Sequence, residues 1–176
     1  MTRLLVCSFM ILICAACKRR HTEATSKVVE SVVETPTAEA SQPNPWPTTD
    51  TLLYYSRGAC FGMCPIFELT VMKDGRAMYV GKNHVDRIGG FYANVSLEDV
   101  EHVRKKANEI GYFQMNPVYD NEIVHDLPNI ITGIEHDGRL HRVLNRYKGP
   151  ASLQRLYAEL DTLIEHQQWQ PVGANK

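Results

Sequence analysis

The chain has 176 residues, of which 44% are hydrophobic and 22% charged, and both values are ordinary for a globular protein. Lys and Arg number 19 against 20 Asp and Glu, so the net charge is -1. This balance argues against nucleic-acid binding, which relies on a surplus of positive charge. No apolar run reaches the roughly 18 to 20 residues that cross a bilayer, which excludes a multi-pass membrane protein.

The first 16 residues are predicted to be a lipoprotein signal peptide. Arg3 supplies a positive start, residues 4–16 are apolar, and the segment closes on Cys14-Ala15-Ala16-Cys17. Small residues before a Cys resemble the lipobox of bacterial lipoproteins, which implies lipidation of Cys17. The alternative is an ordinary cleaved signal peptide in which Cys17 is incidental. Lipidation predicts a location in the bacterial cell envelope, on its periplasmic or extracellular face, with the membrane bound through the anchor.

Residues 17–50 are predicted to form a flexible tether. They are rich in Thr, Ser, Pro and Glu, and they hold too little apolar surface to offset the entropy of ordering them. A single domain is expected over residues 51–169, and residues 170–176 are expected to be a C-terminal tail.

The domain opens with a predicted strand at 52–57, and two cysteines, Cys60 and Cys64, follow it. A pair four positions apart in an exported chain favours a disulfide, and chain-entropy arithmetic gives such a small ring about 2 kcal/mol of stabilisation. Two other interpretations stay open. One is a redox dithiol in which Arg57 stabilises a thiolate, and the other is a metal site that adds a His.

The next elements form a group of strands followed by a helix. Alternating apolar residues, Asp74-Gly75 as a hairpin turn and Ser96 as a helix cap are the signals. Gly111 is the expected residue just beyond the end of the helix. The predicted strands are 66–72, 76–80 and 91–95, the last after a break at Gly89-Gly90.

A similar order recurs in the second half of the domain. Strands are predicted at 130–135 and 140–144 around the Asp137-Gly138 turn, and a helix with a Leu-rich face follows Gly149-Pro150. The expected fold is α+β, a mostly antiparallel sheet of four to six strands with two helices on one face. The two strand–turn–strand–helix units reflect either a duplication or the frequency of Asp-Gly turns.

A second group of candidate residues lies in the loop before the strand at 130–135. Asp120, His125 and Asp126 occur there, where a binding group can sit, and Arg57 is the further candidate. The alternative is a solvated loop. No G-x-S-x-G, phosphate-binding glycine loop or H-E-x-x-H occurs, so no catalytic residue, metal or cofactor is assigned.

Several of these motifs together resemble a known family. Arg57-x-x-Cys60-Phe61-Gly62-x-Cys64-Pro65-x-Phe67, followed by Asp74-Gly75, Tyr79 and Gly81, resembles a bacterial domain of unknown function, number 6438 in that naming series. Asp126-Leu127-Pro128 and the Leu-rich helix containing Asp161 are also similar to that family, so the resemblance spans about residues 51–165. The family is typified by exported lipoproteins, which implies export and the domain limits but no activity.

We therefore expect a non-enzymatic envelope lipoprotein that binds another envelope protein or a cell-wall component. One alternative is an exported thiol-disulfide redox protein that uses Cys60 and Cys64. Another is a hydrolase or small-ligand-binding domain. Its candidate residues are Arg57, Asp120, His125 and Asp126.

Overall fold

The structure, a computed structural model, describes residues 50–173 of the chain. The predicted signal peptide, Cys17 and the predicted tether up to residue 49 lie outside the described residues. Within residues 50–173, no helix has the length and apolar character needed to cross a membrane.

The described chain contains two groups of strands, each followed by one long helix. The strands are β1 (Thr51–Arg57), β2 (Ile66–Met72), β3 (Arg76–Asn83), β4 (Gly89–Asn94), β5 (Val118–Tyr119), β6 (Ile130–His136), β7 (Arg139–Asn145) and β8 (Gln170–Pro171). The helices are α1 (Leu97–Glu109), the short 3-10 helix η2 (Tyr112–Gln114) and α2 (Leu153–His166).

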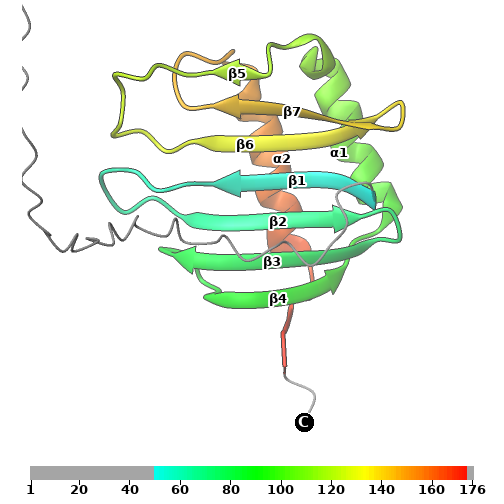
Figure 1. Ribbon diagram of the computed structural model, residues 1–176. Helices are drawn as coiled ribbons and strands as arrows, with labels where there is room; N and C mark the ends of the chain where they lie inside the picture. Colours follow the sequence, from blue (N-terminus) through cyan, green and yellow to red (C-terminus); the bar gives the residue numbers. More distant parts are fainter. Residues whose placement is uncertain (1–49, 174–176) are drawn as a thin grey trace, which may run out of the picture. The chain divides into compact units, whose positions relative to one another are not determined.

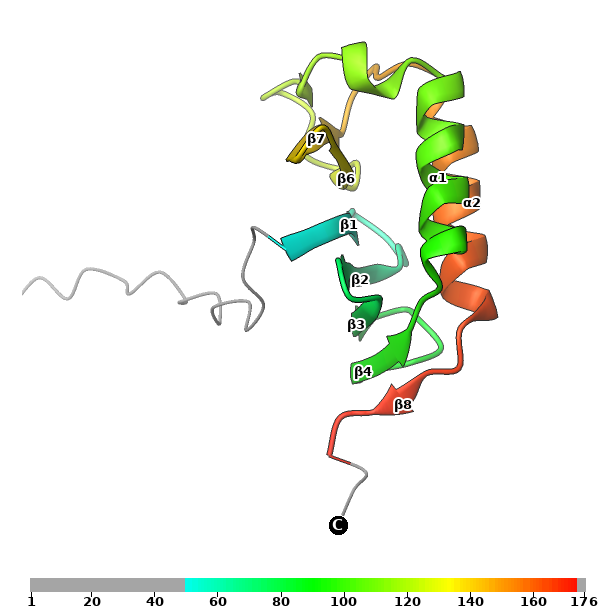
Figure 2. The ribbon, with the colours of Figure 1, turned by 90° about the vertical axis from the view of Figure 1, so that its right-hand side faces the viewer.

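All eight strands belong to one sheet, in the order β5-β7-β6-β1-β2-β3-β4-β8 (Figure 1). Every neighbouring pair is antiparallel except β5 and β7, which are parallel. β1 comes first in the chain but lies inside the sheet, between β2 and β6. Both long helices cover the same face, which gives two layers (Figure 2).

The fold is α+β, but the predicted sheet of four to six mostly antiparallel strands is wrong, because the sheet has eight strands and is mixed. The two additional strands, β5 and β8, have two residues each. They form where the chain runs beside β7 and β4. Two residues are too few to show alternation, so no sequence pattern marks them. The predicted break at Gly89-Gly90 is instead the start of β4.

The β2–β3 hairpin follows from its turn and its alternation. The N–H of Gly75 donates to the Met72 carbonyl at 2.9 Å. Gly75 has a φ of 82°, a left-handed conformation that glycine adopts without strain. The resulting register places Leu69 opposite Tyr79, and both side chains are buried.

A capping residue fixes the start of α1, and an apolar stripe packs α2 against the sheet. Ser96 accepts a hydrogen bond from the Asp99 N–H at 3.0 Å, which caps α1. α2 buries the apolar residues of one stripe, and burial of each large side chain contributes about 1.5 to 3 kcal/mol. These residues are Leu153, Leu156, Tyr157, Leu160, Leu163 and Ile164. The packing fixes α2 against the sheet and sets the position of Asp161, next to the stripe.

Candidate functional site

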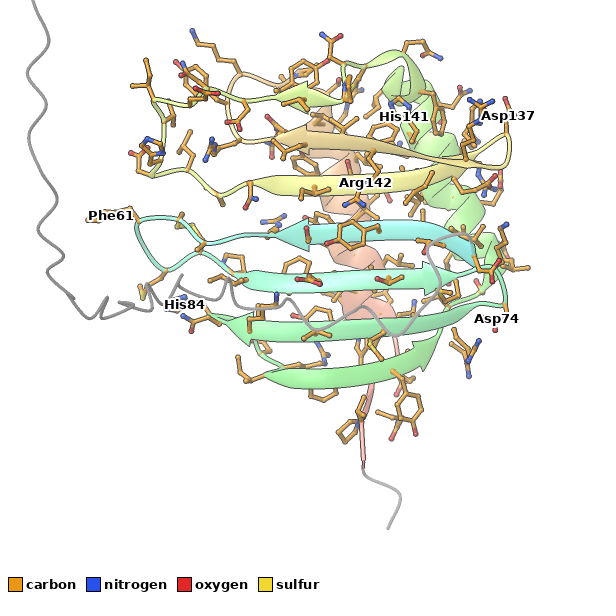
Figure 3. All side chains as sticks on the ribbon, in the orientation of Figure 1. Phe61, Asp74, His84, Asp137, His141 and Arg142 are labelled. Atoms are coloured by element: carbon orange, nitrogen blue, oxygen red, sulfur yellow. A yellow bond between two sulfur atoms is a disulfide. The ribbon has the colours of Figure 1, made fainter. Side chains whose placement is uncertain are left out.

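Three loops lie at the same end of the sheet. The loop of residues 58–65 joins β1 to β2, residues 84–88 join β3 to β4, and residues 120–129 lead from β5 to β6. Figure 3 shows Phe61 and His84 at this end, while the hairpin residues Asp74 and Asp137 lie at the other. We call the end of the sheet with these three loops the loop end.

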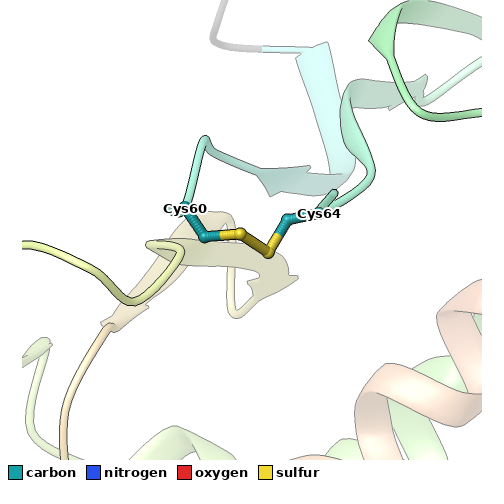
Figure 4. The surroundings of a disulfide bond; sticks show 2 residues. All are labelled: Cys60 and Cys64. Carbon is teal, nitrogen blue, oxygen red and sulfur yellow. A yellow bond between two sulfur atoms is a disulfide. The ribbon is translucent and has the colours of Figure 1, made fainter. Parts of the chain in front are cut away.

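The disulfide loop, residues 58–65, is closed by a bond between Cys60 and Cys64, as predicted (Figure 4). Their Cα atoms lie 5.9 Å apart, within the usual range for a disulfide. The Gly58 N–H donates to the Asn129 carbonyl at 2.9 Å, and a Cβ at Gly58 would overlap the Asn129 side chain. The disulfide loop is therefore held against the 120–129 loop as well as closed on itself.

Two large apolar side chains point into solvent from the disulfide loop. Phe61 is 94% exposed and Met63 is 85% exposed, and we call these two residues the apolar tip. Figure 3 shows Phe61 projecting away from the sheet. On the neighbouring loop, Ile123 is 85% exposed. Side chains of this size contribute nothing to the core when exposed, so they are available for contact with a partner.

Arg57 lies at the base of the disulfide loop and enters a three-residue polar network. Its Nη2 lies 2.5 Å from Oδ2 of Asp161, and its Nε donates to the Tyr55 hydroxyl at 2.6 Å. The Tyr55 hydroxyl in turn donates to Oδ1 of Asp161 at 2.9 Å. The guanidinium also lies over the rings of Tyr55 and Phe67, at 5.5 Å and 6.0 Å from their centroids. The network ties β1 to α2.

Burial dominates the electrostatics of this network. Desolvation raises the pKa of Asp161, although the Arg57 charge and the Tyr55 hydrogen bond act in the opposite direction. Desolvation, together with the nearby Asp161 charge, also raises the pKa of Tyr55 far above its usual value. Tyr55 therefore keeps its proton at physiological pH and remains a hydrogen-bond donor to Asp161.

The structure gives different roles to the other predicted site residues. Arg146 donates to both oxygens of Asp120, at 2.5 Å and 2.9 Å, and this hydrogen bonding is the main cause of the lowered pKa of Asp120. The main-chain carbonyl of Asp126 accepts a hydrogen bond from the Phe61 N–H at 3.2 Å. His125 is exposed. Among the described residues no hydrogen bond or ion pair joins Arg57 to Asp120, His125 or Asp126, so the structure does not bring the four predicted residues into one site.

Asp161 and Tyr55 were not among the predicted site residues, although Asp161 was part of the family resemblance. The available signal was the position of Asp161, a carboxylate directly beside Leu160 in the apolar stripe of α2. A charge that close to a core needs a partner. Across residues 50–173, no group of three or more His, Cys, Asp or Glu side chains is arranged to hold a metal ion.

Comparison with known proteins matches one family and no curated protein. Residues 51–164, more than half of the chain, match the model of DUF6438, described as a domain of unknown function. A search of the curated proteins finds no match. The matched range contains the disulfide loop, Arg57 and Asp161.

Proposed function

For this chain, which belongs to the DUF6438 family of unknown function, we propose the role of an exported, lipid-anchored binding module of the bacterial cell envelope. Residues 1–16 resemble a lipoprotein signal peptide, and Cys17 is the residue expected to carry the lipid. A disulfide between Cys60 and Cys64 fits an oxidising compartment outside the cytoplasm.

The apolar tip is the observation that carries the binding role. A loop that is closed by a disulfide and hydrogen-bonded to its neighbour loses little conformational entropy when a partner docks on it. Phe61 and Met63 are the kind of anchor residues that fill a pocket on a partner. An envelope protein with an apolar pocket is therefore the partner that we propose for this loop.

The two alternative functions have less support. A redox role for Cys60 and Cys64 would benefit from a cation beside the thiolate, but the guanidinium of Arg57 is engaged by Asp161 and Tyr55. A hydrolytic role for Asp120 would need a carboxylate free to act on a substrate, and Arg146 holds both of its oxygens.

Photocrosslinking in intact cells tests the proposal. A photoreactive phenylalanine analogue is placed at Phe61, at Met63 and, as a matched control, at Arg139, the exposed first residue of β7 at the other end of the sheet. We expect a crosslinked protein of one defined mass from positions 61 and 63 but not from 139. Loss of the Met63 crosslink in a Phe61→Ser background would support a shared pocket. The same products from all three positions, or none from 61 and 63, would contradict the proposal.

A further inference from the structure

The sheet has a second face, opposite the helices. Both α1 and α2 lie on one face, and the structure describes no helix on the other, which we call the open face (Figure 2). Tyr55 donates to Asp161 of α2, so its neighbour Tyr54 points to the open face, because successive side chains of a strand alternate. The Arg142 guanidinium lies over the Tyr54 ring, 4.8 Å from its centroid. Figure 3, in which the helices lie behind the sheet, shows Arg142 in front of it.

A row of side chains crosses the middle of the open face. Tyr54 on β1 pairs with Thr70 on β2. Thr70 pairs with Met78 on β3, which pairs in turn with Tyr92 on β4. We call these four residues the middle row. Thr70 is short and only 8% exposed, Tyr54 and Met78 on either side of it are half-buried, and Tyr92 is 40% exposed. The middle row therefore presents two aromatic rings and a thioether, with one small side chain among them.

The burial of Met72 favours a further layer of chain over part of the open face. Met72 is on the same side of β2 as Thr70, two positions away, and it pairs with Thr51 at the start of β1. It is only 3% exposed, although it stands outside the cluster of core residues between the sheet and the helices. A large apolar side chain is buried to this degree only where other atoms lie over it.

The chain that precedes the described residues joins the sheet in its middle. Asp50 is the first described residue, and its carbonyl accepts a hydrogen bond from the Lys73 N–H at 2.7 Å. β1 follows at once and lies between β2 and β6, so the preceding residues start well inside the sheet and not at its edge. Because α1, α2 and the core occupy one face, the open face is the one with room for them.

The composition and length of this preceding segment suit the open face. Residues 43–47 read Pro-Asn-Pro-Trp-Pro and carry no charge. Proline fixes φ and has no N–H, so such a segment loses little entropy on docking and leaves few main-chain donors unpaired on a surface of side chains. Proline-rich segments dock on aromatic surfaces in this way. Trp46 is four positions before Asp50 and can lie about 13 Å from it, whereas the middle row is about 10 Å along β1 from Thr51.

We propose that residues 43–49 of this chain cover the open face, with the indole of Trp46 on Thr70 between Tyr54 and Met78. The direct link to β1 gives this segment a local concentration that a second copy or another protein does not reach, which makes it the favoured occupant. The indole gains an aromatic contact with Tyr54 and a sulfur–aromatic contact with Met78. The flexible part of the predicted tether then ends near residue 42.

Crosslink mapping tests the position of Trp46. A photoreactive phenylalanine analogue replaces Trp46 in the full chain in detergent, and the irradiated protein is digested and analysed by mass spectrometry. We expect a crosslink within one chain to a peptide of β2 or β3. The same analogue at Thr37, farther from β1, is the matched control and should give no defined crosslink within the chain. Crosslinks from position 46 that fall on α1 or α2, that join two chains or that are absent would overturn the proposal.

Fluorine NMR of the full chain labelled with fluorotryptophan tests the contact. The chain contains two tryptophans, and Trp46→Phe assigns the signals. Trp169 donates to the Ile164 carbonyl at 2.7 Å and packs on Tyr79, so its signal reports whether the domain is folded. We expect the Trp46 signal to be protected from a soluble paramagnetic chelate, to the same degree at every protein concentration. A Trp46 as accessible as in urea would overturn the proposal, and protection that rises with protein concentration would assign the face to a second copy and overturn it too.

Substitutions in the middle row locate the protection. Tyr54→Ser and Met78→Ser should each remove most of the protection of Trp46 and leave the Trp169 signal in place. Phe61→Ser and Ile123→Ser, which change exposed apolar residues at the loop end, are the matched controls and should leave Trp46 protected. Protection that is unchanged in both middle-row variants would contradict the proposal. If a middle-row variant shifts the Trp169 signal, the crosslink map and the protection in the parent chain decide.

Discussion

Tyr55 and Arg57 both reach Asp161 because side chains two positions apart on a strand point to the same face of the sheet. The Tyr55 hydroxyl accepts from Arg57 and donates to Asp161, so one phenol satisfies both charged groups. The side chains of Arg57 and Asp161 are 23% and 39% exposed, so the carboxylate is only partly hydrated. Removal of the cation therefore leaves a charge with too little water to compensate it.

The first prediction concerns Arg57→Gln. We expect this variant to lower the free energy of unfolding by about 2 kcal/mol at pH 7, a value reduced from that of a buried pair because both side chains are partly exposed. The loss should be smaller at acidic pH. The pKa of Asp161 is raised in the folded state. The stability that this group contributes is therefore present at pH values below its pKa in the unfolded chain, and it is lost as the pH rises through its pKa in the folded chain. At acidic pH Asp161 is neutral, so it has less need of the Arg57 charge. Urea unfolding at several pH values from about 3.5 to 7 measures both effects.

Asp161→Asn provides the control for this pH dependence. An amide can still accept from Tyr55 and carries no charge to desolvate, so its stability loss should be smaller than that of Arg57→Gln at pH 7. In the Asp161→Asn background, the further substitution Arg57→Gln should then change the free energy of unfolding by nearly the same amount at every pH. A pH-independent loss in Arg57→Gln alone would contradict the role of the Asp161 charge.

Among the elements, the disulfide loop combines a covalent closure with two main-chain hydrogen bonds to the 120–129 loop. These bonds run from Gly58 to Asn129 and from Phe61 to Asp126. The disulfide is therefore one of three restraints on the loop that carries Phe61. Breaking the bond should loosen the loop without unfolding the sheet, because the core residues of β1 and β2 pack independently of it.

The second prediction concerns the cysteine pair. The double variant Cys60→Ser, Cys64→Ser should fold and lose about 2 kcal/mol of stability, the value expected for a ring of this size. Thermal unfolding of the variant beside the unreduced parent measures the difference. Alkylation should not modify the parent cysteines until a reductant is added. Free thiols at both positions in protein isolated without reductant would rule out the structural disulfide.

Long strands and helices of this fold were predictable, and the two-residue strands were not. Alternation over seven residues and the Asp74-Gly75 turn specify the β2–β3 hairpin from local sequence alone. β5 and β8 are strands only because β7 and β4 lie beside them, and that proximity depends on the whole fold. The same limit applies to the site. Arg57 and the cysteines were identified from adjacent sequence, but Asp161 lies 104 positions from Arg57.

At the scale of the whole molecule, the third prediction concerns the proposed lipid anchor at Cys17, a residue outside the described range. Cys17→Ser should abolish incorporation of radiolabelled palmitate and leave the chain unprocessed or released from the membrane fraction, because lipidation of this kind requires the sulfur. Fractionation and labelling in a bacterial host measure both. The parent protein, which keeps Cys17, is the control. Palmitate label that persists in Cys17→Ser would reject the lipobox assignment.

The central position of β1 has a consequence for how the chain folds as it is synthesised. β1 emerges early and can pair at once with β2, but its other edge waits for β6, whose Ile134 pairs with Leu53 about 80 residues later. Such long-range pairing slows folding, and an unpaired apolar strand edge is a template for aggregation. Fragments that end before residue 130 therefore cannot complete the sheet, and the nascent chain must be protected from misassociation until its second half arrives.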